Sequence, residues 1–126
     1  MIVCNAIDIY GTPRHASGPG WQSARMIVKD DGMGYSVHET TVEEGAELHL
    51  EYKHHFETNY CLSGEGEVVD LATGTVHPIT PGTLYALDQH DRHILRATRG
   101  PLRLLCVFHP ALRGDETHSA DGSYDL

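Results

Sequence analysis

The sequence has few cysteines and no long apolar segment. Its three cysteines are an odd number and none are close together, a pattern typical of a reducing compartment rather than a disulfide-stabilised secreted domain. No apolar run approaches the length of a membrane-spanning helix, and the N-terminus lacks the basic, then apolar, pattern of a signal peptide. We therefore expect a cytoplasmic protein that does not act at a membrane.

Positive charge is also scarce. Nine basic side chains stand against 18 acidic ones, giving a formal net charge of -9, which argues against nucleic acid or anionic lipid as a partner. A chain of 126 residues, 40% of them apolar, is long enough for one ordinary hydrophobic core. The sequence predicts one globular domain over residues 1–126, with a small molecule as its partner.

The apolar pattern indicates an all-β fold. No segment keeps a helical period over twelve or more residues, whereas Leu48, Leu50 and Tyr52 alternate with polar residues as in a half-buried strand. Expected strands cover residues 25–29, 35–42, 48–52, 59–62, 67–71, 75–79, 83–87, 93–97 and 102–108. Glycine and proline mark turns between them, among them a tight turn at 63–66, so we expect a sandwich or barrel. From about residue 113 the chain becomes polar, and we expect a loosely ordered tail there.

Three side chains on neighbouring turn-rich segments offer different metal donors. Glu57 supplies a carboxylate, Tyr85 a phenol and His93 an imidazole, and the set contains no thiolate. Such donors suit Fe2+, Mn2+ or Zn2+ acting as an open-site Lewis acid rather than a closed structural zinc. His54 and His55 are adjacent, and we expect a strand there to point them to opposite faces, which prevents both from binding one ion.

Two motifs indicate the fold more closely. The spacing Gly45-x5-Glu51-x-Lys53-x3-Glu57-x6-Gly64 resembles the first cupin motif, and Pro81-Gly82-x2-Tyr85 resembles the second. Longer stretches, including residues 30–40, 52–61, 81–93, 106–112 and 121–124, resemble the ectoine synthase family. This resemblance extends along the whole chain and implies a single-domain cupin, an all-β jelly-roll barrel.

The resemblance also implies an activity and a set of site residues. Ectoine synthases are dimeric cytoplasmic lyases of compatible-solute (osmoprotectant) synthesis, and they cyclise N4-acetyl-L-2,4-diaminobutyrate with loss of water. By similarity Glu57, Tyr85 and His93 are iron ligands, with Fe2+ favoured over Mn2+ or Zn2+. Tyr52 or Glu116 is the candidate proton-transfer residue, and residues 114–118 form a segment that closes over the pocket. The matching substrate-binding positions are Trp21, Ser23, Arg25, Thr40, Cys106 and Phe108.

Other functions stay open at this point. Glu51, His109 and Asp115 differ from the residues usual in the family, and Asp115 lies beside the closing segment, so a related cyclase or ring hydrolase with another substrate is one alternative. A metal-dependent cupin dioxygenase or isomerase is a second, although the donor set departs from the two-His-one-carboxylate pattern of oxygenases. A non-catalytic cupin that binds a small molecule is the third.

Overall fold

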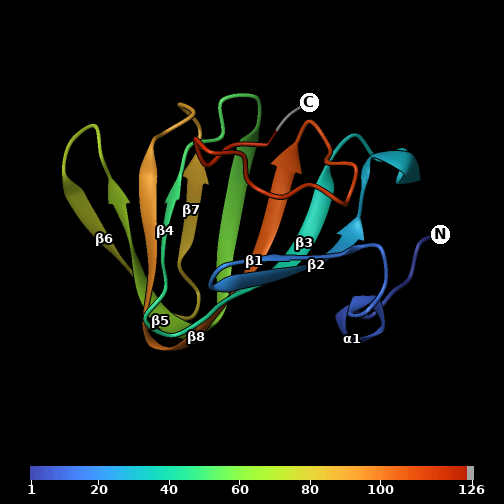
Figure 1. Ribbon diagram of the computed structural model, residues 1–126, viewed down its shortest axis with the longest axis horizontal. Helices are drawn as coiled ribbons and strands as arrows, with labels where there is room; N and C mark the ends of the chain where they lie inside the picture. The colour runs from blue at the N-terminus through green and yellow to red at the C-terminus, as the bar shows by residue number, and fades with distance from the viewer. Residues whose placement is uncertain (125–126) are drawn as a thin grey trace.

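The computed structural model describes residues 1–124, which form a curved, antiparallel β structure (Figure 1). A short helix and a single 3-10 turn at Lys29–Asp31 accompany the strands. The elements are α1 (Ala6–Ile9), β1 (His15–Gly18), β2 (Trp21–Ile27), β3 (Ser36–Val42), β4 (Glu47–Leu50), β5 (Phe56–Asp70), β6 (Thr75–Ile79), β7 (Leu84–Leu87) and β8 (His93–His109). Within residues 1–124 no helix has the length and apolar character needed to cross a membrane.

Two long strands organise the barrel. The strands follow the order β1-β2-β3-β8-β5-β6, with β4 added beside β8 and β7 beside β5. The first half of β8 pairs with β4 and the second half with β3, while β5 pairs first with β7 and then with β6. Because each long strand has different neighbours in its two halves, β5 and β8 belong to both faces of a jelly roll, as predicted.

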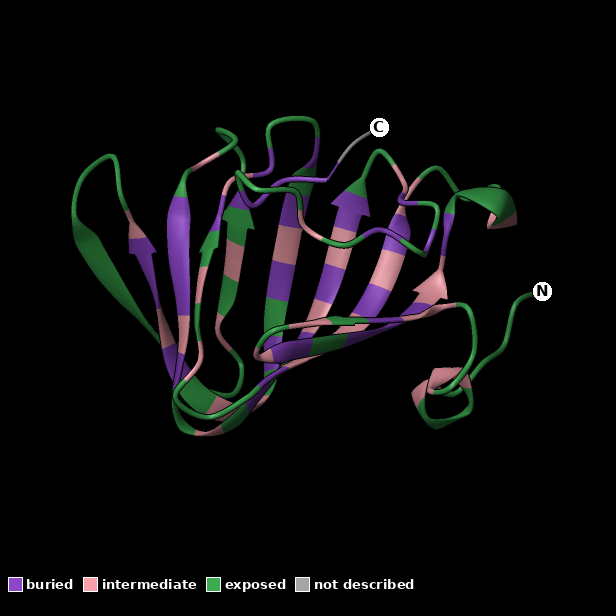
Figure 2. Ribbon diagram, viewed as in Figure 1, coloured by how far each residue is buried: buried purple, intermediate pink, exposed green. Residues whose placement is uncertain are grey.

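Alternating burial along the strands places the core between these faces (Figure 2). On β5 the side chains of Glu57, Asn59 and Cys61 point inward, whereas those of Tyr60 and Leu62, which alternate with them, are exposed. On β8 Cys106 and Phe108 are buried, as the two-residue period predicts. The inward face of β5 therefore brings the polar groups of Glu57 and Asn59 against the apolar core.

The predicted tight turn at residues 63–66 is wrong, because β5 continues through this segment as one strand. Its pairing with β8 is irregular between Cys61 and Gly66, which marks bulges. Gly64 has a φ of +84°, and a Cβ there would collide with the carbonyl oxygen of Pro101. Glycine thus allows the two long strands to approach and bend, and residues 93–109 likewise form one strand rather than two.

The C-terminal segment, residues 110–124, is packed rather than loosely ordered. It crosses the end of the barrel at which β8 finishes (Figure 1). The Leu112 carbonyl accepts a hydrogen bond from the Lys29 amide, and the Gly122 carbonyl accepts one from the Glu51 amide. Two of its own side chains, those of Glu116 and Tyr124, are buried. The polar composition misled the prediction because polar groups of this segment form hydrogen bonds within it, as the Glu116 carboxylate does with the Arg113 and Gly114 amides. The last two residues of the predicted tail lie outside the described residues.

Candidate active site

An interior cavity of about 30 Å³ lies inside the barrel. Its walls come from β2, β3, β4, β5, β7 and β8, and the C-terminal segment adds His118 and Tyr124. Most of the predicted site residues line it, namely Trp21, Thr40, Tyr52, Glu57, Tyr85, Cys106 and Phe108. Ser23, Arg25, Glu116 and His93 are also buried but do not line this cavity.

Glu57 and Tyr85 reach the cavity from neighbouring strands. Glu57 is opposite Leu87 in the β5–β7 ladder and Tyr85 is opposite Asn59, so the two residues are diagonal neighbours on the inward face. Burial raises the pKa of Glu57 to about 7, although the nearby Asn59 and Cys106 side chains lower it in part. Burial, and then the Glu57 charge, raises the pKa of the Tyr85 phenol well above its ordinary value. A cation between these groups would favour the charged form of both.

His93, the first residue of β8, is oriented by a backbone carbonyl. Its Nδ1 lies 2.8 Å from the Asp91 carbonyl oxygen, which can only accept, so Nδ1 carries the hydrogen. Its Nε2 is buried and has no hydrogen-bond partner among the described residues. Burial lowers the pKa of His93, and the Asp91 carbonyl opposes this in part. The ring centroid is 6.0 Å from that of Tyr52, which lines the cavity.

These residues fit a metal ion. A metal-binding histidine commonly donates its second ring N–H to a carbonyl, which is the arrangement of His93. Over residues 1–124 no three side chains among His, Cys, Asp and Glu cluster closely enough to hold a metal. A site that used Glu57 and His93 would need a third donor of another kind. The Tyr85 phenol is a candidate, because Tyr85 is diagonal to Glu57 in the ladder and lines one cleft with His93.

Tyr52 and His118 form the closest polar pair at the cavity. The Tyr52 hydroxyl lies 2.9 Å from His118 Nε2, and burial raises the pKa of the phenol well above its ordinary value. Burial, followed by the charge of Arg25, lowers the pKa of His118 to about 4. Both groups are neutral at pH 7, and the tautomer of His118 decides which of them donates the hydrogen bond. Tyr124 stacks against both rings, with centroids 5.2 Å from Tyr52 and 4.6 Å from His118.

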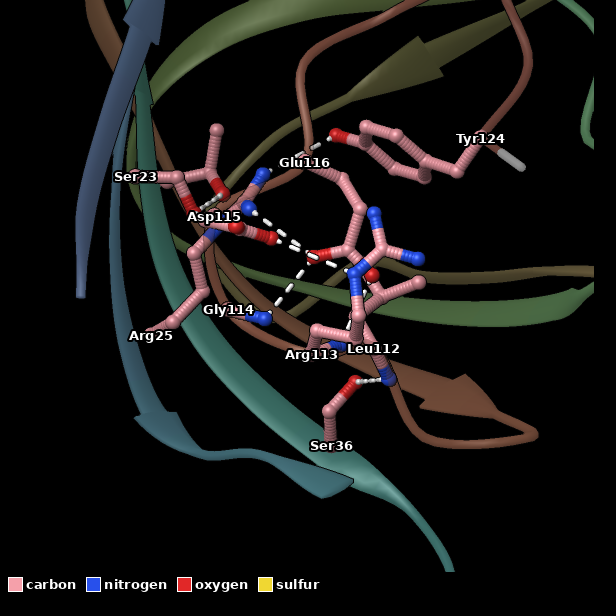
Figure 3. A network of polar contacts seen from close by, with 10 residues as sticks. Ser23, Arg25, Ser36, Leu112, Arg113, Gly114, Asp115, Glu116 and Tyr124 are labelled. Carbon is pink, nitrogen blue, oxygen red and sulfur yellow. Dashed lines mark hydrogen bonds and ion pairs between the residues drawn. The ribbon is translucent and has the colours of Figure 1, made fainter. Parts of the chain in front are cut away.

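Arg25 is fully buried and joins β2 to the C-terminal segment (Figure 3). Its Nε donates to Ser23 Oγ at 3.3 Å and its Nη2 donates to the Tyr124 hydroxyl at 3.3 Å. Its Nη1 is 3.7 Å from Glu116 Oε1 and has no hydrogen-bond partner in the described part of the chain. Thr40 Oγ1 in turn lies 3.2 Å from Ser23 Oγ, which links this network to the cavity wall.

Glu116, the second candidate for proton transfer, is held by the backbone of its own segment. Its two carboxylate oxygens accept hydrogen bonds from the amides of Arg113 at 2.7 Å and Gly114 at 2.8 Å. Together with Arg25 these donors surround the carboxylate (Figure 3). Asp115, beside it, points to solvent with 74% of its side chain exposed, so it does not shape the cavity.

Several cavity residues were not predicted as site residues from the sequence. His38 is two positions before Thr40 and Asn59 two positions after Glu57, so strand alternation alone places each of them on the inward face. Tyr124 had no such signal. His54 and His55 were expected on a strand but lie in the turn before β5, where His55 is buried and His54 is exposed.

Known proteins resemble this chain over its full length. The sequence profile described as ectoine synthase matches residues 1–126. The chain belongs to the ectoine synthase family. An L-ectoine synthase of Desulfosudis oleivorans is 51% identical over 126 residues, covering 100% of this chain and 98% of its own. One from Hyphomonas neptunium is 51% identical over 125 residues, covering 98% of this chain and 93% of its own.

Solved structures agree with this family and fold. The crystal structure of ectoine synthase from P. lautus has a TM-score of 0.85 and 43% identity, covering 90% of this chain and 81% of that one. A cupin domain of a transcriptional regulator from Enterobacter cloacae, 15% identical with a TM-score of 0.61, shows the shared cupin fold alone. As a member of the ectoine synthase family the chain is an enzyme of the lyase class, and its cupin jelly roll is confirmed.

Proposed function

We propose that this enzyme converts N4-acetyl-L-2,4-diaminobutyrate into L-ectoine and water with a bound metal ion, Fe2+ above Mn2+ or Zn2+. The function would be compatible-solute synthesis in the cytoplasm. The observation that carries the proposal is the ectoine synthase match over residues 1–126, combined with the buried Glu57 carboxylate, the half-buried Tyr85 phenol and the buried His93 imidazole. Glu57 and Tyr85 line one cavity, and Tyr85 and His93 line a neighbouring one.

The reaction closes a ring within one molecule. The substrate's free amine forms a bond to the acetamide carbonyl carbon, the carbon–oxygen bond breaks, and the oxygen leaves with two protons as water. The amine must be unprotonated and folded back onto the carbonyl. Holding it in that geometry contributes up to roughly 7–11 kcal/mol in favourable cases. The apolar walls from Trp21 and Phe108 suit the methyl and methylene groups and exclude water, which would reverse the reaction.

Glu57, Tyr85 and His93 would hold the metal, with His93 binding through its unpartnered Nε2. When bound, the metal supplies a Lewis acid that stabilises negative charge developing on the carbonyl oxygen. The Asp91 carbonyl keeps the Nδ1 hydrogen of His93 in place, which leaves Nε2 as the donor atom.

Tyr52 and His118 are the residues best placed to move protons. The neutral imidazole of His118 can accept the proton that the amine loses, and the Tyr52 hydroxyl, 2.9 Å from His118 Nε2, can pass a proton toward the departing oxygen. Glu116 is a weaker candidate than the sequence indicated, because backbone amides and Arg25 already occupy its carboxylate. Arg25 Nη1, which has no hydrogen-bond partner among the described residues and lies 3.7 Å from Glu116, would exchange this ion pair for one oxygen of the substrate carboxylate.

The cavity must enlarge before a substrate enters. Its volume of about 30 Å³ is far below the roughly 300 Å³ of the smallest ligand pockets. His118 and Tyr124 belong to the C-terminal segment, so displacement of this segment would open the cavity between Trp21 and Tyr52. The segment then serves as the pocket cover that the family resemblance implies.

The proposal includes a homodimer. Phe56, Tyr60 and Leu62 on β5 and Leu84 on β7 are exposed apolar side chains, and Tyr60 pairs directly with Leu84 in the ladder. A second copy covering this face would remove their apolar surface from water. Light scattering should give twice the 13.9 kDa chain mass; a monomer at micromolar concentration would contradict this part.

An anaerobic assay tests the activity. Metal-free protein is reconstituted with Fe2+, Mn2+ or Zn2+, given N4-acetyl-L-2,4-diaminobutyrate, and followed by chromatography of the product. We expect ectoine only in the metal-loaded samples, with Fe2+ most active. A folded, iron-loaded enzyme that forms no ectoine would move the activity to another substrate. Equal rates in the chelated control would remove the metal from the proposal.

A further inference from the structure

His90 has an unusual backbone conformation in the loop between β7 and β8. Its φ is 52°, and it is the one non-glycine residue with positive φ among residues 1–124. Such a conformation costs of the order of 1 kcal/mol or more and persists where surrounding contacts fix it. Its ring stacks on Phe56, the first residue of β5, with centroids 4.7 Å apart and planes at 22°.

The imidazole binds both ends of a neighbouring turn. His90 Nδ1 lies 2.8 Å from the carbonyl oxygen of Tyr52 and 3.1 Å from that of His55. Because carbonyl oxygens only accept, Nδ1 carries the hydrogen and shares it between the two. Residues 52 and 55 flank the turn that connects β4 to β5, so one side chain closes this turn from outside.

This contact joins the two segments that carry the site. Tyr52 begins the clasped turn and Glu57 follows it by two residues, while His90 lies between Tyr85 on β7 and His93 on β8. A displacement of either segment would change the separation of Glu57 from His93. The other end of this loop is held by the Leu71 amide, which donates to the Arg92 carbonyl, and by the contact of His93 with the Asp91 carbonyl.

We infer that His90 is a positioning residue: through Nδ1 it fixes the turn at 52–55 against the loop at 88–92 and thereby sets the spacing of Glu57 and Tyr52 relative to His93. The effect on the order of the turn follows from the His90 contacts alone, whereas the effect on metal affinity rests also on the proposed function.

Three variants separate the hydrogen bonds from the backbone strain. His90→Gly accepts the positive φ but removes the donor. His90→Asn also tolerates this φ, and its amide nitrogen stands where Nδ1 was, so it should restore the bonds. His54→Gly is the control, because it removes an exposed imidazole from the 52–55 turn itself and adds the backbone freedom of glycine there.

Two readouts distinguish failure of this inference from failure of the proposed function. In metal-free protein, hydrogen exchange of the peptide covering residues 51–57 should be about tenfold faster in His90→Gly and near wild type in His90→Asn. In a Co2+ titration followed by visible absorption, His90→Gly should bind about 10–100-fold more weakly, and His90→Asn and His54→Gly should bind like the wild type.

Wild-type exchange in His90→Gly would overturn the inference, and so would a loss of protection in His90→Asn equal to that in His90→Gly. Unchanged Co2+ affinity in His90→Gly would overturn its role in ligand spacing. A wild-type protein that binds no metal would instead contradict the proposed metal centre, and the exchange experiment would still decide the role of His90.

Discussion

The Glu57 carboxylate is buried within the barrel beside the Tyr85 phenol, and no basic side chain in residues 1–124 forms an ion pair with it. A charged carboxylate in such a place is destabilising, which is why its pKa rises to about 7. A metal cation would reverse this preference by stabilising the charged carboxylate and the phenolate together. The electrostatics of these two residues thus favour a site that is completed by a cation.

Glu57→Gln should have opposite effects without and with metal. In metal-free protein at pH 8 the wild-type carboxylate is charged, so the variant should be more stable by about 1–3 kcal/mol. Because the folded pKa is raised, this advantage should vanish as the pH falls below 7 toward 4.5. With Fe2+ present the wild type should be the more stable protein. Urea unfolding at pH 8 and pH 5 checks this, and a destabilised metal-free variant at pH 8 would contradict it.

Buried histidines predict the opposite pH dependence. Burial lowers the pKa values of His38, His55, His93 and His118, the last to about 4. Below pH 6.5 the unfolded chain takes up protons that the folded protein resists, so these groups make stability fall between pH 6.5 and 4. His118→Gln should flatten this fall, whereas the exposed His54→Gln should not. Urea midpoints from pH 7.5 to 4 test the difference; parallel curves for wild type and His118→Gln would refute it.

Among the elements, β5 and β8 determine the barrel, and glycines at their bends make this possible. Gly64 and Gly66 both lie where a side chain would collide with the backbone of β8, at Pro101 and Arg96. These glycines let one strand serve both faces of the jelly roll. They also explain why glycine here marks a bulge and not the predicted end of a strand.

Gly64→Ala should therefore be destabilising by at least about 2 kcal/mol, because it adds a backbone collision to the cost of a left-handed conformation. Gly74 offers a matched control. Its φ of +75° is similar, but a Cβ there meets no atom within 4 Å, so Gly74→Ala should cost only about 1 kcal/mol. Thermal or urea unfolding of both variants measures the contrast, and equal losses would show that the collision is unimportant.

Local pattern predicted the strands that alternate and the residues that share a face. The period of two correctly placed Leu50 and Tyr52 in the interior, and it placed Cys106 and Phe108 on the same face of their strand. The same period is compatible with the three metal donors proposed from the sequence, because it places Glu57 and Tyr85 on the inward faces of neighbouring strands. It missed β1. It also could not predict that β5 and β8 are unbroken, because this depends on the close approach of their backbones at Gly64 and Gly66. These are properties of the folded pair of strands, not of either segment alone.

At the scale of the whole molecule, the chain closes on itself through its C-terminal segment. Arg25 on β2 contacts Tyr124, a residue 99 positions later, and Glu116 completes the same buried network. No local pattern predicts such a contact, and polar composition suggested a free tail instead. The result is a covered cavity lined by the stacked rings of Tyr52, Tyr124 and His118 and by Glu57, Tyr85 and Cys106.

A metal centre built from Glu57, Tyr85 and His93 requires the Tyr85 phenol as a donor. Phenolate bound to Fe3+ absorbs visible light by charge transfer, so air oxidation of the iron-loaded enzyme gives a direct readout. We predict a visible band in the wild type that persists in Tyr52→Phe and disappears in Tyr85→Phe. A band that survives Tyr85→Phe, or one that Tyr52→Phe removes, would contradict this metal centre.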